Sequence, residues 1–182
     1  MFQFSRNRQG HPLLNQGQLE ILSRANRQVT SKKPGEAGKL FAQLAQEMEA
    51  TDHPRRAANF HALAAHSFAD ALDEKRALAH AQNALTLFIE YLMTARMIRF
   101  FTNITNKMSS YNMTDAVKTL QDEFGQKISA APAPALKPEP PKSARLPAAC
   151  PKCGAPVHST EVNWIDDQRA ECIYCGSVLQ TT

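Results

Sequence analysis

Four cysteines near the C-terminus constrain this chain more than any other feature. They form two C-x-x-C-G motifs, Cys150–Gly154 and Cys172–Gly176. Two cysteines three residues apart on a tight turn direct both sulfurs at one ion, and the following glycine tolerates the backbone that this turn requires. Two such turns complete a tetrahedral four-sulfur cage. The sequence therefore predicts one metal site, with zinc as the ion and with four ligands: Cys150, Cys153, Cys172 and Cys175.

The spacing of the two motifs resembles that of a zinc ribbon. Between them, residues 161–165 alternate like a strand, residues 166–168 can turn, and residues 169–171 return toward the second motif. Residues 177–180 offer a third short strand. A three-stranded unit of this size cannot bury enough apolar surface to fold alone, so the metal must supply much of its folding energy.

Other uses of the four cysteines fit the sequence less well. Disulfides are disfavoured in a cytosolic protein, and a thioredoxin-like redox pair needs a strand–helix–strand unit that the sequence lacks. An iron site with four thiolates is the remaining alternative. His158 is expected to be a surface strand residue and not a ligand. Because all four ligands are protein sulfurs, no position remains for a catalytic water.

The chain before residue 131 has the pattern of a helical domain. Its apolar residues recur at spacings of three and four. The expected first-turn or N-cap residues are Pro12, Pro34, Asp52, Asp73 and Thr114. A further helix includes residues 97–104, and no glycine or proline separates it from the preceding helix. Gly125 is a candidate for the end of the last helix. The predicted fold class is mainly α, with a helical bundle or hairpin stack over residues 1–129.

One helix pair within this domain resembles a single tetratricopeptide unit. Small residues and one aromatic residue fall at spacings of 3, 9 and 7, at Ala65, Phe68, Ala77 and Ala84. The pattern departs from the family at His61 and Ala81, where large aromatic residues are usual, and no proline ends the unit. No second copy is evident. The alternative interpretation is an ordinary alanine-rich helix pair in a bundle.

Proline and charge separate the two domains. Residues 130–149 contain six prolines and no apolar periodicity, which predicts a semi-rigid, extended linker. Residues 150–182 carry two basic and four acidic side chains, a net charge of −2. A zinc–tetrathiolate cage adds formally another −2, which opposes phosphate binding. The one basic patch lies near the N-terminus, at Arg6, Arg8, Arg24, Arg27, Lys32, Lys33 and Lys39.

The sequence lacks the motifs of an independent enzyme or a membrane protein. It contains no G-x-S-x-G, no phosphate-binding glycine loop and no H-E-x-x-H. No apolar run approaches the roughly 18 residues of a membrane span, and the N-terminus shows no apolar signal-peptide core. We therefore expect a cytoplasmic protein that is not an enzyme.

These features favour an intracellular adaptor. The helical domain is expected to bind one protein, and the tethered ribbon another, through Trp164, Ile165, Ile173 and Tyr174. The same four side chains can instead form the core of the ribbon. A helical domain of this kind can also dimerise through an apolar face.

Two alternative functions stay open. The first is a ubiquitin-ligase-like recruiter, in which one loop offers Pro151, Pro156 and Ile173 to a conjugating enzyme. It would look like a minimal relative of the ring-finger ligases, which use eight ligands around two ions; four cysteines exclude a full ring finger. The second is a nucleic-acid-associated ribbon protein, which the acidity of the ribbon opposes.

Overall fold

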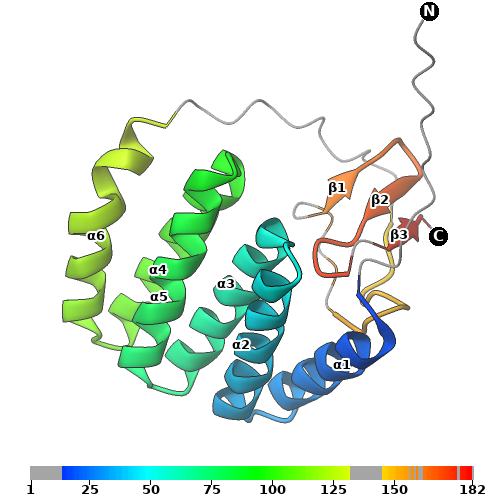
Figure 1. Cartoon of the computed structure of the whole chain (residues 1–182), viewed down its shortest axis with the longest axis horizontal. Coiled ribbons are helices and arrows are strands. Elements are labelled where there is room, and N and C mark those ends of the chain that lie inside the picture. Colours follow the sequence, from blue (N-terminus) through cyan, green and yellow to red (C-terminus); the bar gives the residue numbers. More distant parts are fainter. Residues whose placement is uncertain are drawn as a thin grey trace, which may run out of the picture.

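The computed structural model describes residues 14–131, 145–155, 157, 159, 162–175 and 177–181. Its helices lie side by side in an arc, in sequence order, and a small sheet lies beside the N-terminal half of that arc (Figure 1). The six helices are α1 (Gln16–Thr30), α2 (Pro34–Ala50), α3 (Pro54–Asp70), α4 (Glu74–Glu90), α5 (Thr94–Ser110) and α6 (Thr114–Ser129). The predicted mainly α class is confirmed.

All five turns between the helices have the same geometry. One residue in each turn has a positive φ of 53–60°, and these residues recur every 20 positions: Lys32, Asp52, Leu72, Leu92 and Asn112. In the first turn, the N–H of Lys33 bonds to the carbonyl of Gln28 at 2.9 Å, and the N–H of Lys32 bonds to that of Val29 at 3.0 Å. This pair of bonds defines the Schellman motif, which usually contains glycine at the left-handed position. Here it closes each of the helices α1 to α5 without one.

Small residues let the central helices approach closely. Ala37, Ala57 and Ala77 are 20 positions apart, begin the core faces of α2, α3 and α4, and are fully buried. Ala64 and Ala84, which are also 20 positions apart, lie about two turns further along α3 and α4 and are fully buried as well. Because alanine side chains occupy little volume, neighbouring helices can approach more closely at these levels than larger side chains would allow.

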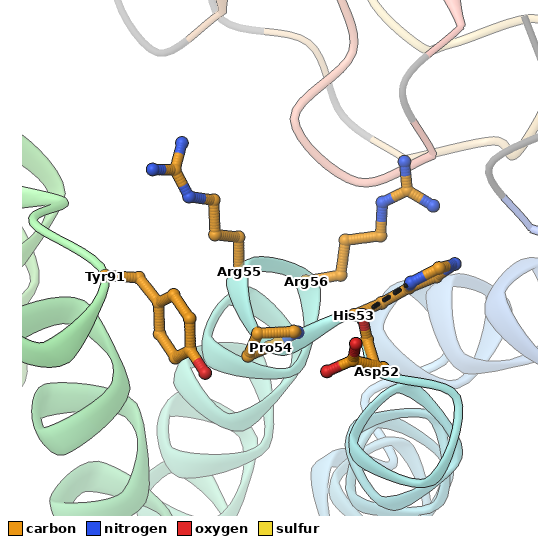
Figure 2. Close-up of a pocket in the computed structure, with 6 residues that line it drawn as sticks. All are labelled: Asp52, His53, Pro54, Arg55, Arg56 and Tyr91. Carbon is orange, nitrogen blue, oxygen red and sulfur yellow. Dashed lines mark hydrogen bonds between the residues drawn. The ribbon is translucent and has the colours of Figure 1, made fainter.

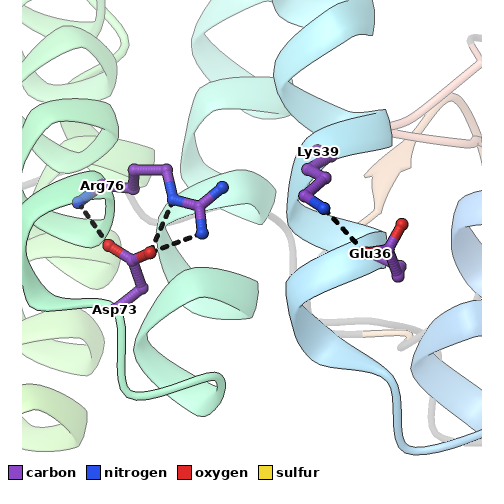
Figure 3. A network of polar contacts seen from close by, with 4 residues as sticks. All are labelled: Glu36, Lys39, Asp73 and Arg76. Carbon is purple, nitrogen blue, oxygen red and sulfur yellow. Dashed lines mark hydrogen bonds and ion pairs between the residues drawn. The ribbon is translucent and has the colours of Figure 1, made fainter.

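Phe68 fills the space that these small residues leave. Its ring is 1% exposed and stacks on His80, with the ring centroids 5.4 Å apart. The Arg76 guanidinium lies over the Phe68 ring, 4.4 Å from its centroid. Arg76 is held by Asp73, whose side chain caps α4 by accepting from the Arg76 backbone N–H at 3.0 Å (Figure 3). A second ion pair, Lys39–Glu36 at 2.8 Å, lies on α2.

The C-terminal sheet consists of three short antiparallel strands. They are β1 (Asn163–Trp164), β2 (Arg169–Glu171) and β3 (Val178–Gln180), in the order β1-β2-β3. Trp164 pairs with Ala170, and Ala170 pairs with Leu179, so these three side chains share one face. Ala170 and Leu179 are buried there. We call the described residues from 145 onward the C-terminal unit.

The C-terminal unit packs against the helices through side-chain amides. The Asn26 amide on α1 donates to the carbonyl of Cys153 at 3.2 Å, and the Asn59 amide on α3 donates to the carbonyl of Ile173 at 3.3 Å. The Asn59 carbonyl in turn accepts from the Arg96 guanidinium on α5 at 3.1 Å. A chain of hydrogen bonds therefore runs from α5 through α3 to the unit. The unit begins before the first cysteine, because the Ala148 carbonyl accepts from the Val157 N–H at 2.9 Å.

Several predicted helix boundaries were correct and others were wrong. Pro34 begins α2, and Asp73 caps α4, as predicted. Asp52 is not an N-cap, because it occupies the left-handed position of the preceding turn. Thr114 is the first residue of α6 and makes no cap. Gly125 does not end α6, which continues to Ser129.

Other predictions concern the rest of the chain. The helices before and after residue 92 are separate, since the Schellman turn breaks them without glycine or proline. Pro12 and most of the predicted linker, residues 132–144, lie outside the described residues. No helix in the described ranges is both long enough and apolar enough to cross a membrane.

Candidate metal centre

The first cysteine motif is a tight turn that brings its two sulfurs to one side. The N–H of Gly154 bonds to the carbonyl of Cys150 at 2.8 Å, and Gly154 adopts a φ of +71°, where a side chain would be strained. The Cys150 N–H bonds to the carbonyl of Ala155 at 2.8 Å. Contact with the neighbouring thiols, chiefly Cys150, raises the pKa of Cys153, and a hydrogen bond from the Ala155 backbone to its sulfur partly offsets this shift. The role predicted for Gly154 is therefore confirmed.

The second motif closes in the same way. The N–H of Cys172 bonds to the carbonyl of Ser177 at 2.9 Å, just as Cys150 bonds to Ala155. Each motif thus forms a small loop whose first cysteine is hydrogen-bonded to the residue five positions later. The second glycine of the pattern, Gly176, lies outside the described residues, as does His158.

The two loops bring all four cysteines together. Their sulfur atoms lie within 4.8 Å of one another, all four residues are buried, and none forms a disulfide. The Sγ atoms of Cys150 and Cys175 are 3.7 Å apart, and those of Cys153 and Cys172 are 3.9 Å apart. Metal–sulfur bonds of about 2.3 Å in a tetrahedron give sulfur–sulfur edges of about 3.8 Å. The sulfurs therefore have the spacing of a four-thiolate metal site.

The charge of these sulfurs points to the same conclusion. A hydrogen bond with the Cys153 thiol lowers the pKa of Cys150, and the same contact raises the pKa of Cys153. Contact with Cys150 likewise raises the pKa of Cys172. Four thiolates at this spacing cannot all ionise without a cation among them, because their mutual repulsion is not compensated. A bound cation permits all four to ionise and act as ligands.

Ser177 contacts two of the four cysteines, and this contact was not predicted from the sequence. Its hydroxyl lies 3.2 Å from the sulfur of Cys150 and 3.0 Å from that of Cys175. A hydroxyl has one proton, so it donates to one thiolate at a time. Hydrogen bonds to ligand sulfurs stabilise their charge and orientation. The only hint in the sequence is a small polar residue two positions after the last cysteine.

The four residues that were predicted to contact a partner differ in their exposure and in their contacts. Ile165 is 52% exposed, beside the turn after β1. Trp164 is half-buried, and its indole N–H donates to the Ser159 carbonyl at 2.9 Å. Ile173 and Tyr174 are half-buried and line a cavity against α3 and α5. Their part in partner binding stays a prediction.

Arginines of the helical domain face the C-terminal unit. Arg56 and Arg96 both interact electrostatically with Glu171 on β2, and Arg56 also interacts with Cys175. Burial lowers the pKa of both guanidinium groups, and Glu171 partly offsets this shift. Arg56, with Arg55 beside it, also lines a cavity of about 400 Å³ at the start of α3 (Figure 2). Glu171 of the C-terminal unit thus lies against positively charged side chains of α3 and α5.

A polar cluster around the buried His61 joins α2, α3 and α4. The Nε2 atom of His61 lies 3.1 Å from Oε1 of Glu49, and its Nδ1 atom lies 2.8 Å from Nδ1 of His80. Burial lowers the pKa of His61, and burial together with the nearby His61 lowers the pKa of His80 to about 4. Both rings are therefore neutral at pH 7. His61 donates to the Glu49 carboxylate through its Nε2–H, so its Nδ1 accepts a hydrogen bond from the Nδ1–H of His80. The cluster cross-links three helices that the sequence showed only as separate segments.

Comparison with known proteins adds no family assignment to this geometry. The metal centre and the helix contacts therefore rest on the residues themselves. No protein-family model, curated protein or solved structure matches the chain.

Proposed function

We propose that the C-terminal unit is a zinc ribbon, folded around its metal, and that the chain is a protein adaptor whose ribbon docks on its helical domain. The observation that carries the first part is the set of four buried sulfurs within 4.8 Å of one another. Zinc prefers four thiolates in a tetrahedron for structural sites. Such a set leaves no open coordination position, so the role proposed for the ion is structural and not catalytic.

Zinc binding and docking to the helices would support each other. The Asn26 amide bonds to the carbonyl of Cys153, which belongs to a ligand residue. A zinc ion with four thiolates carries a formal charge of −2. Arg56, which interacts with Cys175, would stabilise that charge. Loss of the metal is therefore expected to loosen the ribbon and its contact with α1 and α3 together.

Support for the adaptor role comes from two exposed apolar side chains on the ribbon. Ile165 is 52% exposed and Val178 is 54% exposed. Val178 alternates with buried Leu179, so it lies on the sheet face opposite the core. Both side chains are therefore accessible to another protein. We place the partner surface on these two residues, because Ile173 and Tyr174 face the helices instead.

The metal is tested on the purified full chain. Elemental analysis is expected to give about one zinc per chain, and exchange for Co²⁺ should give the absorption spectrum of a tetrahedral four-thiolate site. Two disulfides with no metal, or an iron centre in the protein as isolated, would contradict the zinc assignment.

The adaptor role is tested with matched surface variants. Ile165→Ser and Val178→Ser should abolish capture of a specific protein from the native host without loss of zinc. The control is Leu72→Ser. The Leu72 side chain is 67% exposed and follows the C-terminal end of α3, whereas Asn59, which contacts the C-terminal unit, lies near the N-terminal end of this helix. If all three variants capture the same proteins as wild type, the ribbon face is not the interface.

A further inference from the structure

A cavity of about 200 Å³ lies where the second cysteine loop meets α3 and α5. Leu63, Phe88 and Phe100 contribute apolar lining from three helices, and Ile173 contributes it from the C-terminal unit. A cavity of about 150 Å³ accommodates benzene, so this one has room for a small ring-sized molecule. Ligand sites are frequently found between structural units, with apolar walls and a few polar groups.

The charged groups of this cavity are two guanidinium groups, which only donate hydrogen bonds. Arg96 and Arg99 lie one turn apart on α5 and both line it, as do Asn103 and His66. No carboxylate belongs to the described residues that line the cavity. Glu171 interacts with Arg96 from outside this lining. The cavity therefore combines two guanidinium groups with an apolar wall and no acidic group of its own.

His66 adds a neutral group to this arrangement. Its ring meets Phe100 edge to face, with the centroids 5.4 Å apart. Burial, with a smaller effect of Lys107, lowers the pKa of His66 to about 4, so the ring is uncharged at pH 7. An uncharged imidazole can donate or accept a hydrogen bond without adding a further positive charge. Positive charge in the cavity thus comes from the two arginines.

We propose that this cavity binds a small organic carboxylate, whose charged end pairs with Arg96 and Arg99 and whose apolar body packs on Leu63 and Phe100. The planar guanidinium fork matches a carboxylate, and such charge-assisted pairs are the strongest hydrogen bonds in proteins. Because the lining comes from both the helices and the C-terminal unit, a ligand here would stabilise the docked state of the unit. This activity goes beyond the adaptor role, which needs no small ligand.

The proposal is tested with benzoate on the metal-loaded full chain, and benzamide is the matched neutral probe of the same shape. Benzoate is expected to raise the thermal unfolding midpoint and to bind measurably by calorimetry, whereas benzamide should do neither. Inorganic phosphate tests whether any anion suffices. Equal responses to benzoate and benzamide, or tighter binding of phosphate than of benzoate, would overturn the carboxylate assignment.

A pair of arginine variants locates the site. Arg99→Gln should weaken benzoate binding roughly tenfold or more, the usual effect of losing a charge-assisted bond. Arg55→Gln is the control, since Arg55 is exposed and lines the other cavity. If both variants bind benzoate like wild type, or both lose it equally, the ligand is not held at this cavity. The wild-type comparison of benzoate with benzamide remains decisive if Arg99→Gln does not fold.

Discussion

Replacing Gly38 by alanine tests how closely α2 and α3 pack. A Cβ atom at this position would lie 2.8 Å from Cδ1 and Cε1 of Phe68 and 3.1 Å from its Cγ. Carbon atoms pack best at about 3.5–4.0 Å, so the ring or the helix must move. The Phe68 ring has little room to do so, because it lies against His80 and beneath Arg76. Overpacking of this kind costs about 1–3 kcal/mol. Alanine recovers about 1 kcal/mol of helix propensity, so we expect a net destabilisation of up to about 2 kcal/mol.

Gly125 provides the matched control for this substitution. It also lies within a helix, α6, but a Cβ atom there would meet nothing within 4 Å. Gly125→Ala is therefore expected to stabilise the protein by about 1 kcal/mol. Urea denaturation followed by circular dichroism measures both variants, and equal slopes would show that the unfolding transition is comparable. If Gly38→Ala stabilises the protein as much as Gly125→Ala, the helices adjust at no cost and the packing argument is wrong.

Three further predictions concern the docked unit and His80. Cys153→Ser should remove the metal and increase amide exchange throughout the C-terminal unit and at its contact with α1. The amides of α6 should keep their protection. If α6 instead exchanges as fast as the C-terminal unit, the whole fold depends on the metal. Asn59→Ala removes the donor to Ile173, so exchange at the second cysteine loop should rise without loss of zinc. The pKa of His80 is lowered to about 4, so this ring is neutral in the fold and protonated in the unfolded chain between pH 4 and 6.5. The free energy of unfolding should therefore fall as the pH is lowered through this range. In the same urea titrations, the free energy of unfolding of the His80→Gln variant should fall less steeply.

The metal site was predictable because its information is local. Each C-x-x-C-G motif specifies its own turn, and the structure closes both turns with the same backbone bond. Only the pairing of the two turns is non-local, and four cysteines in two pairs leave few alternatives. Ser177 could not be predicted, because a serine near a cysteine is common and its contact with two sulfurs depends on how the loop closes.

The helix ends were harder to predict because their usual signals are missing. Glycine is the residue that normally marks a left-handed helix end, but Leu72 and Leu92 occupy this position in two of the turns. Asp52 has the character of an N-cap and instead takes the same left-handed position. The information lies in the spacing: apolar positions recur at 20 residues, so two helices with their turns span 40 residues. A tetratricopeptide unit spans 34, and repeat length therefore does not support that resemblance.

The same period explains how one small unit meets two separate helices. Arg56 on α3 and Arg96 on α5 are 40 positions apart and occupy equivalent places in their helices, and both interact with Glu171. Asn59 and Arg99 are also 40 positions apart, and both line the cavity at the edge of the C-terminal unit. A repeated helix pair thus presents the same row of positions twice, toward the same side. The C-terminal unit contacts the positions on α3 through Asn59. The equivalent positions on α5 end at Arg99, where the proposed carboxylate site lies.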